Sequence, residues 1–178
     1  MADISDLKMT IVTNDPTKRY YYTLLFDDKY RVKIATRNIN IPGVQNFRDL
    51  GGYPSYSTKK QMRWGMIYRS AEIDSLECSS RRELKNLGIK TLIDLRASSE
   101  IGRQSPLQKG FNVVHIPLAT GDMEGILKGI REEKIKSDTV YRMVERMNRV
   151  LIDQYTKEYR QIFDILLDKN SYPVVCLL

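Results

Sequence analysis

Two stretches near the amino terminus alternate between apolar and polar side chains with a period of two residues. The even-numbered residues of 20–26 would share one face of a strand, and residues 30–34 alternate in the same way. Asp27 and Asp28 interrupt the pattern between these stretches. Two alternating runs around a short acidic turn predict a β-hairpin. Because an isolated hairpin is marginally stable in water, we expect it to pack on the main body or to join a larger sheet.

Further along the chain, three runs are apolar almost without interruption. They are Lys90–Leu95, Val113–Leu118 and Val174–Leu178, and a shorter strand is expected at Met66–Ala71. Continuous apolar character is typical of strands that are covered on both faces of a sheet. We therefore predict that Lys90–Leu95 is a central strand with the other two long runs at its sides.

Helical patterns lie between and after these strands. Ser80 and Glu83 fit a Ser-x-x-Glu capping box, and Gly88 would end the helix that begins there. From Thr139 to Leu167, apolar residues recur every three or four positions. This period predicts one long amphipathic helix, or two helices with a break near Asn148.

The order of the predicted elements indicates the fold class. Strands that alternate with helices are typical of an α/β fold with a mostly parallel sheet flanked by helices. We expect residues 1–40 to form an arm and the β-hairpin, and residues 41–178 to form the α/β domain. In such sheets ligands bind beyond the carboxyl ends of the strands. Asp94 and Arg96 stand at such an end.

Composition narrows the class of protein. The chain has 178 residues, of which 42% are hydrophobic and 29% are charged, as in a globular domain. No apolar run reaches the ~18 residues of a membrane helix, and no signal peptide is visible. Two cysteines are too few for a disulfide framework. We expect a cytoplasmic protein without a transmembrane segment.

The chain is basic, with a formal net charge of +7. Its Lys and Arg residues are mixed with acids in every segment, which favours solvated faces over a nucleic-acid surface. A mildly positive field still favours anionic ligands. The sequence therefore predicts an anionic ligand and no nucleic-acid partner.

Residues 46–53 read Asn-Phe-Arg-Asp-Leu-Gly-Gly-Tyr and form the most distinctive stretch. Arg48 and Asp49 put opposite charges side by side between apolar residues. The pair Gly51-Gly52 allows a positive φ or a close approach of another segment. Taken alone, this stretch could be an ordinary polar turn with a surface ion pair.

Charges beside apolar residues cost free energy unless they are paired. We therefore predict that Arg48, Asp49, Asp94 and Arg96 converge on one cleft and bind substrate there. The alternative is an ion-pair network with only a structural role. His115, the single histidine, lies within a predicted strand, and we interpret it as a packing residue with satisfied hydrogen bonds in preference to a catalytic base.

Four blocks of the sequence follow one another along the chain: Asn46–Tyr53, Trp64–Ser70, Leu87–Arg96 and Tyr172–Val175. Together they resemble the bacterial protein-tyrosine/serine phosphatases with dual-specificity or lipid-phosphatase-like activity. Residues 19–40 also resemble the hairpin that precedes the catalytic domain in some members.

The resemblance implies phosphomonoester hydrolysis through a phosphocysteine intermediate, without a metal or cofactor. Such a site needs backbone N–H groups and an Arg around the phosphate, a thiolate nucleophile, and an acid for the leaving oxygen. In relatives these groups lie in a His-Cys-x-x-Gly-Lys-Asp-Arg-Thr loop after the strand that follows Tyr-Pro. The implied partner is a phosphorylated protein or another phosphomonoester such as a phosphoinositide.

This chain reads Cys176-Leu-Leu after Val175 and does not contain that loop. Cys176 stands two places early for the nucleophile and has no His before it. We expect the chain to be an inactive, truncated phosphatase. The alternative is a non-catalytic pseudophosphatase that binds phosphorylated partners, and a weaker third reading is a rhodanese-like sulfur carrier.

A missing loop would also remove the helices that normally follow it and cover one face of the sheet. We therefore expect apolar side chains of the last strand to be partly exposed. Exposed apolar patches of this kind mark missing partners or sites of aggregation. The sequence predicts self-association through this uncovered sheet face, or marginal stability. The residues concerned are Val174, Val175, Leu177 and Leu178.

Overall fold

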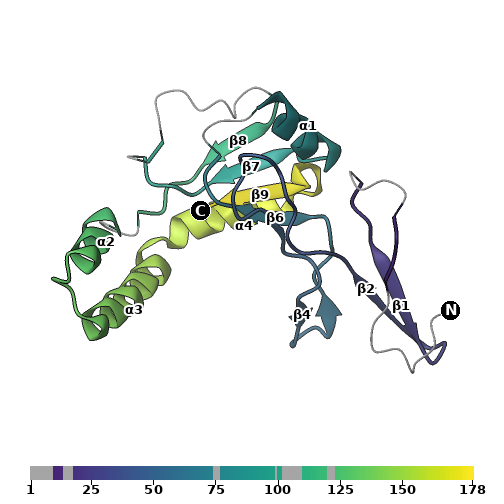
Figure 1. Cartoon of the computed structure of the whole chain (residues 1–178), viewed down its shortest axis with the longest axis horizontal. Helices are drawn as coiled ribbons and strands as arrows, with labels where there is room; N and C mark the ends of the chain where they lie inside the picture. Colours follow the sequence, from purple (N-terminus) through teal and green to yellow (C-terminus); the bar gives the residue numbers. More distant parts are fainter. Residues whose placement is uncertain (1–9, 14–17, 74–76, 99, 102–109, 120–122) are drawn as a thin grey trace. The chain divides into compact units, whose positions relative to one another are not determined.

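The computed structural model describes the chain except for residues 1–9, 14–17, 74–76, 99, 102–109 and 120–122. Most of the polar segment 98–106, predicted to be a turn or short helix, lies outside the described residues. The chain divides into two compact units, Met1–Thr36 and Arg37–Leu178 (Figure 1). Each unit is described by itself below.

The first unit contains the predicted hairpin. Strands β1 (Tyr22–Phe26) and β2 (Tyr30–Ile34) pair antiparallel in a two-stranded sheet. Asp27 and Asp28 have φ values of 47° and 54°, so the turn uses left-handed residues. Asp tolerates this conformation better than most residues, and two such residues form the turn whose twist matches a hairpin. The predicted hairpin is confirmed.

A five-stranded sheet forms the centre of the second unit, in the order β3-β6-β9-β7-β8. Strand β3 is antiparallel to β6, and the remaining neighbours are parallel. Strand β7 lies between β9 and β8 and is buried at every residue, so the predicted central strand is confirmed. The bounds are Arg48–Asp49 for β3, Ile67–Ser70 for β6, Thr91–Asp94 for β7, Asn112–His115 for β8 and Val174–Leu177 for β9.

The described part of the second unit also contains four α-helices and, separately, a small hairpin of two short strands. The amphipathic region predicted from Thr139 is divided in two, but the break falls at Tyr155 and not near Asn148. Among the described helices, none combines the length and apolar character that crossing a membrane requires. The bounds are Pro54–Ser55 for β4, Lys60–Gln61 for β5, Cys78–Asn86 for α1, Met123–Arg131 for α2, Ser137–Gln154 for α3, Thr156–Leu167 for α4 and Lys169–Ser171 for a 3-10 turn.

Helix α1 begins three residues earlier than the capping box predicts. Its N-cap is Glu77, and Ser80 lies inside the helix with its side chain buried. The Ser80 hydroxyl donates a hydrogen bond to the carbonyl of Pro42. The Ser80 hydroxyl therefore bonds to a distant segment of the chain and does not cap the helix. The predicted end is confirmed, because Gly88 has a φ of +73° and donates its N–H to the carbonyl of Lys85.

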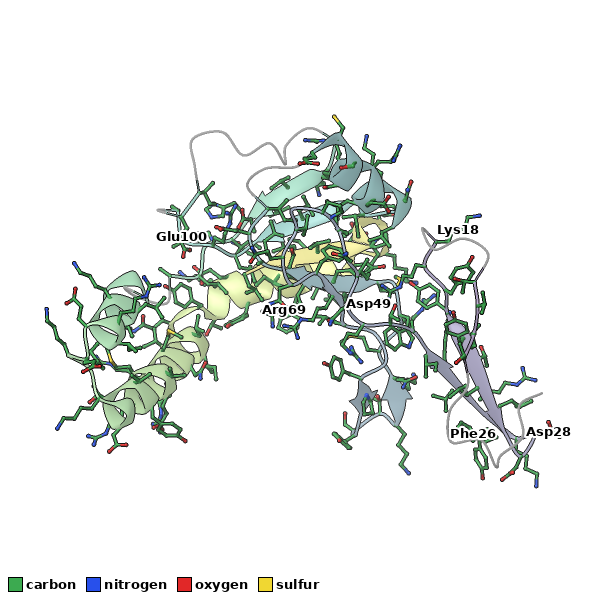
Figure 2. All side chains as sticks on the ribbon, viewed as in Figure 1. Lys18, Phe26, Asp28, Asp49, Arg69 and Glu100 are labelled. Carbon is green, nitrogen blue, oxygen red and sulfur yellow. The ribbon has the colours of Figure 1, made fainter. Side chains whose placement is uncertain are left out.

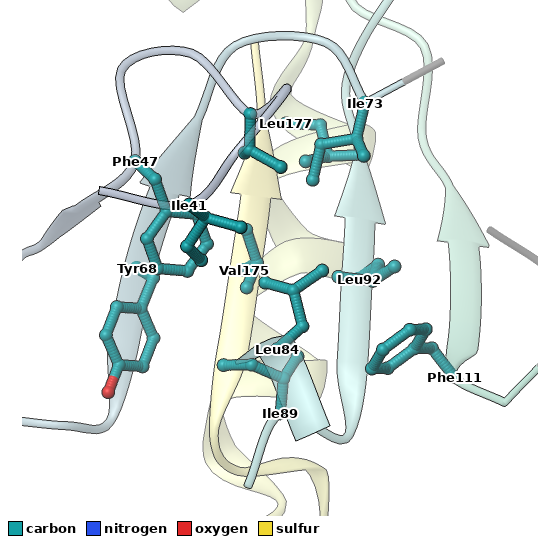
Figure 3. Close-up of a cluster of buried hydrophobic side chains, with 11 residues drawn as sticks. Ile41, Phe47, Tyr68, Ile73, Leu84, Ile89, Leu92, Phe111, Val175 and Leu177 are labelled. Carbon is teal, nitrogen blue, oxygen red and sulfur yellow. The ribbon is translucent and has the colours of Figure 1, made fainter. Parts of the chain in front are cut away.

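Apolar clusters cover both faces of the sheet. On one face, loop 41–47 and α1 enclose Val175 and Leu177 together with side chains of β6 and β7 (Figure 3). On the other face, α4 packs Ile162 against Val174 and its neighbours. Val174, Val175 and Leu177 have no exposed surface. The predicted exposure of this strand is therefore wrong for these three residues, and only Leu178 is exposed, at 54%.

Candidate functional site

A cleft of about 680 Å³ opens at the carboxyl ends of the parallel strands. Ala71 follows β6, Leu95 and Arg96 follow β7, and Leu178 follows β9, and all of them line the cleft. This is the position at which α/β sheets bind ligands, because connections diverge there and leave a crevice. The other lining residues are Gly43, Gln45, Glu72, Glu100, Leu118, Leu151 and Tyr159.

Asp94 and Arg96 form a buried ion pair beside this cleft. Arg96 Nε donates to Asp94 Oδ1 at 2.9 Å, and Nη2 donates to Oδ2 at 2.8 Å. The backbone N–H of Arg96 also donates to Oδ1, at 3.2 Å. A bidentate contact fixes the guanidinium plane as well as its position. Arg96 is therefore held rigidly at the cleft wall.

Two further acids line the cleft beside Arg96. Glu72 Oε2 lies 3.8 Å from Arg96 Nη1, and the Glu72 side chain is 65% exposed. Glu100 accepts a hydrogen bond from the backbone N–H of Ala97 at 2.6 Å. The residues that line the cleft thus include one cation and two carboxylates. A dianionic ligand would have to displace Glu72 from Arg96 or bind beside it.

His115 contacts the backbone that carries Arg96. Its Nε2 lies 2.9 Å from the carbonyl oxygen of Arg96. A carbonyl only accepts hydrogen bonds, so Nε2 must carry the proton. His115 is exposed at the end of β8, an outer strand of the sheet. The ring is therefore exposed and not packed in the core, and its hydrogen bond to the backbone supports the cleft wall.

Helix residues form an apolar wall opposite these charges. Leu151 comes from α3 and Tyr159 from α4, and Leu118 follows β8. Tyr155, at the break between the helices, donates its hydroxyl hydrogen to the carbonyl of Ala119 at 2.7 Å. This contact anchors the helix junction beside the wall. The cleft therefore has a charged side from the strands and an apolar side from the helices.

Asp49 lies elsewhere and organises the Gly-Gly turn of the 46–53 stretch. Its Oδ1 accepts from the N–H of Gly51 at 2.7 Å, and its Oδ2 accepts from the N–H of Gly65 at 2.8 Å. The carboxylate is completely buried. Gly65 precedes β6, so Asp49 acts at the amino end of that strand, opposite to the end that carries the cleft.

The close packing of Trp64 explains why residues 51 and 52 are both glycine. A Cβ on Gly51 would lie 2.4 Å from the Trp64 Cα, and a Cβ on Gly52 would lie 2.3 Å from the indole ring. Arg37 donates to the carbonyls of Asp49 and Gly51 and lies over the Trp64 ring, 5.2 Å from its centroid. The stretch is thus a compact structural turn.

The predicted convergence of four charged residues is wrong. Asp94 and Arg96 meet at the cleft, whereas Asp49 lies on β3, three strands from β7, and Figure 2 shows it well away from Glu100 at the cleft. Arg48 pairs across strands with Arg69, and its Nε donates to Asn46 Oδ1 at 2.7 Å. The antiparallel direction of β3 carries the chain away from the carboxyl ends of the parallel strands.

The two cysteines are placed very differently. Cys176 lies within β9, between Arg69 of β6 and Ile93 of β7. Burial raises the pKa of its thiol to about 11. Cys78 is exposed at the first residue of α1. A nucleophilic thiol needs an environment that lowers its pKa, which is the opposite of the environment of Cys176.

Sequence reasoning did not single out Glu72, Leu151 or Tyr159 as site residues. Glu72 could have been found, because it closely follows a strand whose carboxyl end was expected to meet a ligand. Leu151 and Tyr159 have no local signal, since they look like any apolar residue of an amphipathic helix. Among the residues that the structure describes, no cluster of three or more His, Cys, Asp or Glu side chains could hold a metal ion.

The sequence matches a known protein family over most of its length. Residues 39–177 match the tyrosine phosphatase family. Triple specificity protein phosphatase PtpB of Mycobacterium tuberculosis (strain ATCC 25618 / H37Rv) is 38% identical over 79 residues. That alignment covers 43% of this chain, and the chain spans only 27% of the length of PtpB. The family match extends from just before the Asn46–Tyr53 stretch to the end of β9, so the chain belongs to the tyrosine phosphatase family.

Proposed function

We propose that this protein binds the phosphomonoester groups of phosphorylated proteins, and that the cleft beyond β6, β7 and β9 receives the phosphorylated side chain. The observation that carries the proposal is the position of Leu178. In the relatives that the sequence resembles, the nucleophile loop directly follows the strand after Tyr-Pro, and here that strand is β9. Leu178, the residue after β9, lines the cleft.

Arg96 is the proposed substrate contact, and Asp94 is its positioning residue. Asp94 binds Nε and Nη2 of the guanidinium, so a phosphate oxygen would approach near Nη1 and compete with Glu72. The apolar wall of Leu118, Leu151 and Tyr159 suits a large side chain such as the ring of phosphotyrosine. Arg48 and Asp49 do not line the cleft, so we assign them no part in this contact.

Hydrolysis in this family needs a thiolate that attacks phosphorus and a bed of N–H groups that holds the phosphate. Neither Cys78 nor Cys176 lines the cleft, and the raised pKa of Cys176 keeps its thiol protonated at neutral pH. We therefore propose that the 178-residue polypeptide binds phosphorylated ligands without hydrolysing them. The cytoplasm is the proposed compartment, since both cysteines are unpaired, as is usual there.

A binding assay tests the site. Fluorescence anisotropy with a labelled phosphotyrosyl peptide should show binding that the unphosphorylated peptide lacks. Glu72→Gln should tighten binding by about two- to fivefold, because an exposed carboxylate beside Arg96 repels phosphate. Arg96→Lys should weaken it, since Lys does not reproduce the bidentate pair with Asp94. Equal affinity for the two peptides would contradict the proposed function.

A kinetic assay tests the absence of turnover. The 178-residue polypeptide should not release phosphate from p-nitrophenyl phosphate or from a phosphotyrosyl peptide. Turnover that disappears in Cys176→Ser would show that Cys176 is a nucleophile after all. Turnover that survives this substitution would point to another site or to a contaminating enzyme.

A further inference from the structure

A row of hydrogen-bond donors crosses one half of the sheet, away from the cleft. Asn38 forms an antiparallel bridge with Arg48, and Arg48 is directly opposite Arg69 of β6. Residues opposite each other in neighbouring strands point to the same face of a sheet. The side chains of these three residues therefore share one face.

The same row continues into the apolar core. Arg69 is in register with Cys176 of β9, and Cys176 is in register with Ile93 of β7. Helix α4 covers this second half of the row, where Ile93 packs in the cluster that includes Ile162. The row thus changes from donor side chains to apolar side chains between β6 and β9.

Placing Arg48 and Arg69 opposite each other is unfavourable without a compensating anion. Like charges directly opposite on neighbouring strands destabilise a sheet. The Nε of Arg69 is buried and has no hydrogen-bond partner. In the described part of the chain, no hydrogen bond or ion pair joins Arg48 or Arg69 to an acidic residue. A buried guanidinium nitrogen without a partner costs free energy, and an oxyanion toward which the Arg69 side chain turns would recover it.

We propose that Asn38, Arg48 and Arg69 form a second anion site, which takes a phosphate-sized dianion. Two guanidinium groups supply two positive charges and planar sets of donors, which match a tetrahedral phosphate better than a monoanionic carboxylate. The Asn38 amide adds a neutral donor at the exposed end of the row. None of the three residues lines the cleft, so this site is separate from the proposed substrate site.

NMR spectra of the 15N-labelled 178-residue chain can test this site through the arginine Nε–Hε signals. The Arg69 signal is identified by its loss in Arg69→Lys, which has no such group. Inorganic phosphate, added at constant ionic strength, should shift this signal saturably, and acetate at equal concentration should shift it much less. Arg48→Met should weaken phosphate binding about tenfold or more, because it removes a charged hydrogen-bond partner.

Matched variants separate this site from general charge effects. Arg82→Met removes an exposed positive charge on α1 and should leave the phosphate affinity unchanged. Asn38→Ala should weaken binding less than Arg48→Met does, and amide spectra establish that each variant is folded. If Arg48→Met does not fold, Arg48→Lys should weaken binding, because Lys lacks the planar donor set.

Three results would overturn the proposal. They are an unmoved Arg69 signal, equal shifts with acetate, and an affinity that Arg48→Met does not change. Phosphate shifts confined to the amides of Ala71 and Leu178 would place the anion in the cleft. That result would reject the second site and leave the proposed function intact.

Discussion

Arg96 and Asp94 meet edge to edge, with two nitrogens of the guanidinium on the two oxygens of the carboxylate, at 2.9 and 2.8 Å. The two residues are 5% and 2% exposed, so water reaches neither to any extent. Removing one partner from such a pair leaves an uncompensated buried charge, which costs more than the pair itself contributes. The pair therefore controls both stability and the shape of the cleft wall.

Asp94→Ala should lower the free energy of unfolding by about 3–5 kcal/mol, because Arg96 would remain buried without its counter-ion. Urea denaturation monitored by circular dichroism measures the loss. Glu145→Gln is the matched control, since Glu145 pairs with Arg149 at 2.7 Å on an exposed helix surface. That change should cost less than about 1 kcal/mol. Equal losses in the two variants would contradict the assignment of Asp94.

Gly52→Ala should destabilise the protein by more than about 2 kcal/mol, because it combines a left-handed backbone with a steric clash. Gly52 has a φ of +80°, and its Cβ would lie 2.3 Å from the Trp64 ring. Gly88→Ala is the control, since its φ is +73° but the nearest atom to its Cβ would be Pro173 Cγ, 4.0 Å away. It should cost about 1–2 kcal/mol from the backbone alone. Thermal melting of the two variants compares their losses of stability. Adding Trp64→Leu should recover part of the loss in Gly52→Ala and none of the loss in Gly88→Ala.

Cys176 should make stability fall at high pH. Its thiol has a pKa of about 11 in the folded protein against an ordinary value of 9.0. The unfolded chain therefore loses this proton first, and the free energy of unfolding decreases as pH rises from about 9 to 11. The decrease is on the order of 2 kcal/mol, and the full contribution is present below about pH 9. Denaturation of the parent chain and of Cys176→Ala at several pH values measures it.

The difference in free energy of unfolding between the parent chain and Cys176→Ala isolates the contribution of Cys176. Tyr and Lys residues that titrate in the same range contribute equally to both proteins. Thiol labelling gives an independent check. A thiol reagent at pH 8 should modify Cys78 at once and Cys176 only after unfolding, because Cys78 is exposed. Rapid modification of both cysteines in the folded protein would contradict the raised pKa.

Residues 37–178 should fold without the hairpin. Every residue of the two apolar clusters lies between Ile39 and Leu177, so removing residues 1–36 takes nothing from either cluster. We expect the melting temperature to change by less than about 3 °C, which corresponds to roughly 1 kcal/mol or less. Differential scanning calorimetry measures the change. Loss of cooperative unfolding in the shortened chain would show that the hairpin supports the α/β unit.

Local sequence patterns determined the main elements. The alternation around Asp27 and Asp28 predicted the hairpin, because a period of two and a turn tolerant of positive φ require no distant partner. The largely apolar run of Lys90–Leu95 predicted a central strand, and every residue of β7 is buried, as in a strand that is covered on both faces. The motif blocks predicted the family that residues 39–177 match.

Contacts between distant segments decided where the charges and hydroxyls act. Ser80 fits a cap by local spacing, but its hydroxyl donates to Pro42, which is 38 residues earlier. Asp49 resembles the partner of Arg48, yet it binds the N–H groups of Gly51 and Gly65 because β3 runs antiparallel to β6. Strand direction, which no local pattern encodes, separated Asp49 from the cleft.

The cleft and the burial of the last strand also depended on tertiary structure. Val174 and Val175 are covered because loop 41–47, α1 and α4 pack on opposite faces of β9. Leu151 and Tyr159 line the cleft because the helix break at Tyr155 brings α3 and α4 to the ends of the strands. By itself the sequence determined which segments are strands or helices, since those choices depend on neighbours within a few residues. Which side chains meet was decided by packing across the whole unit.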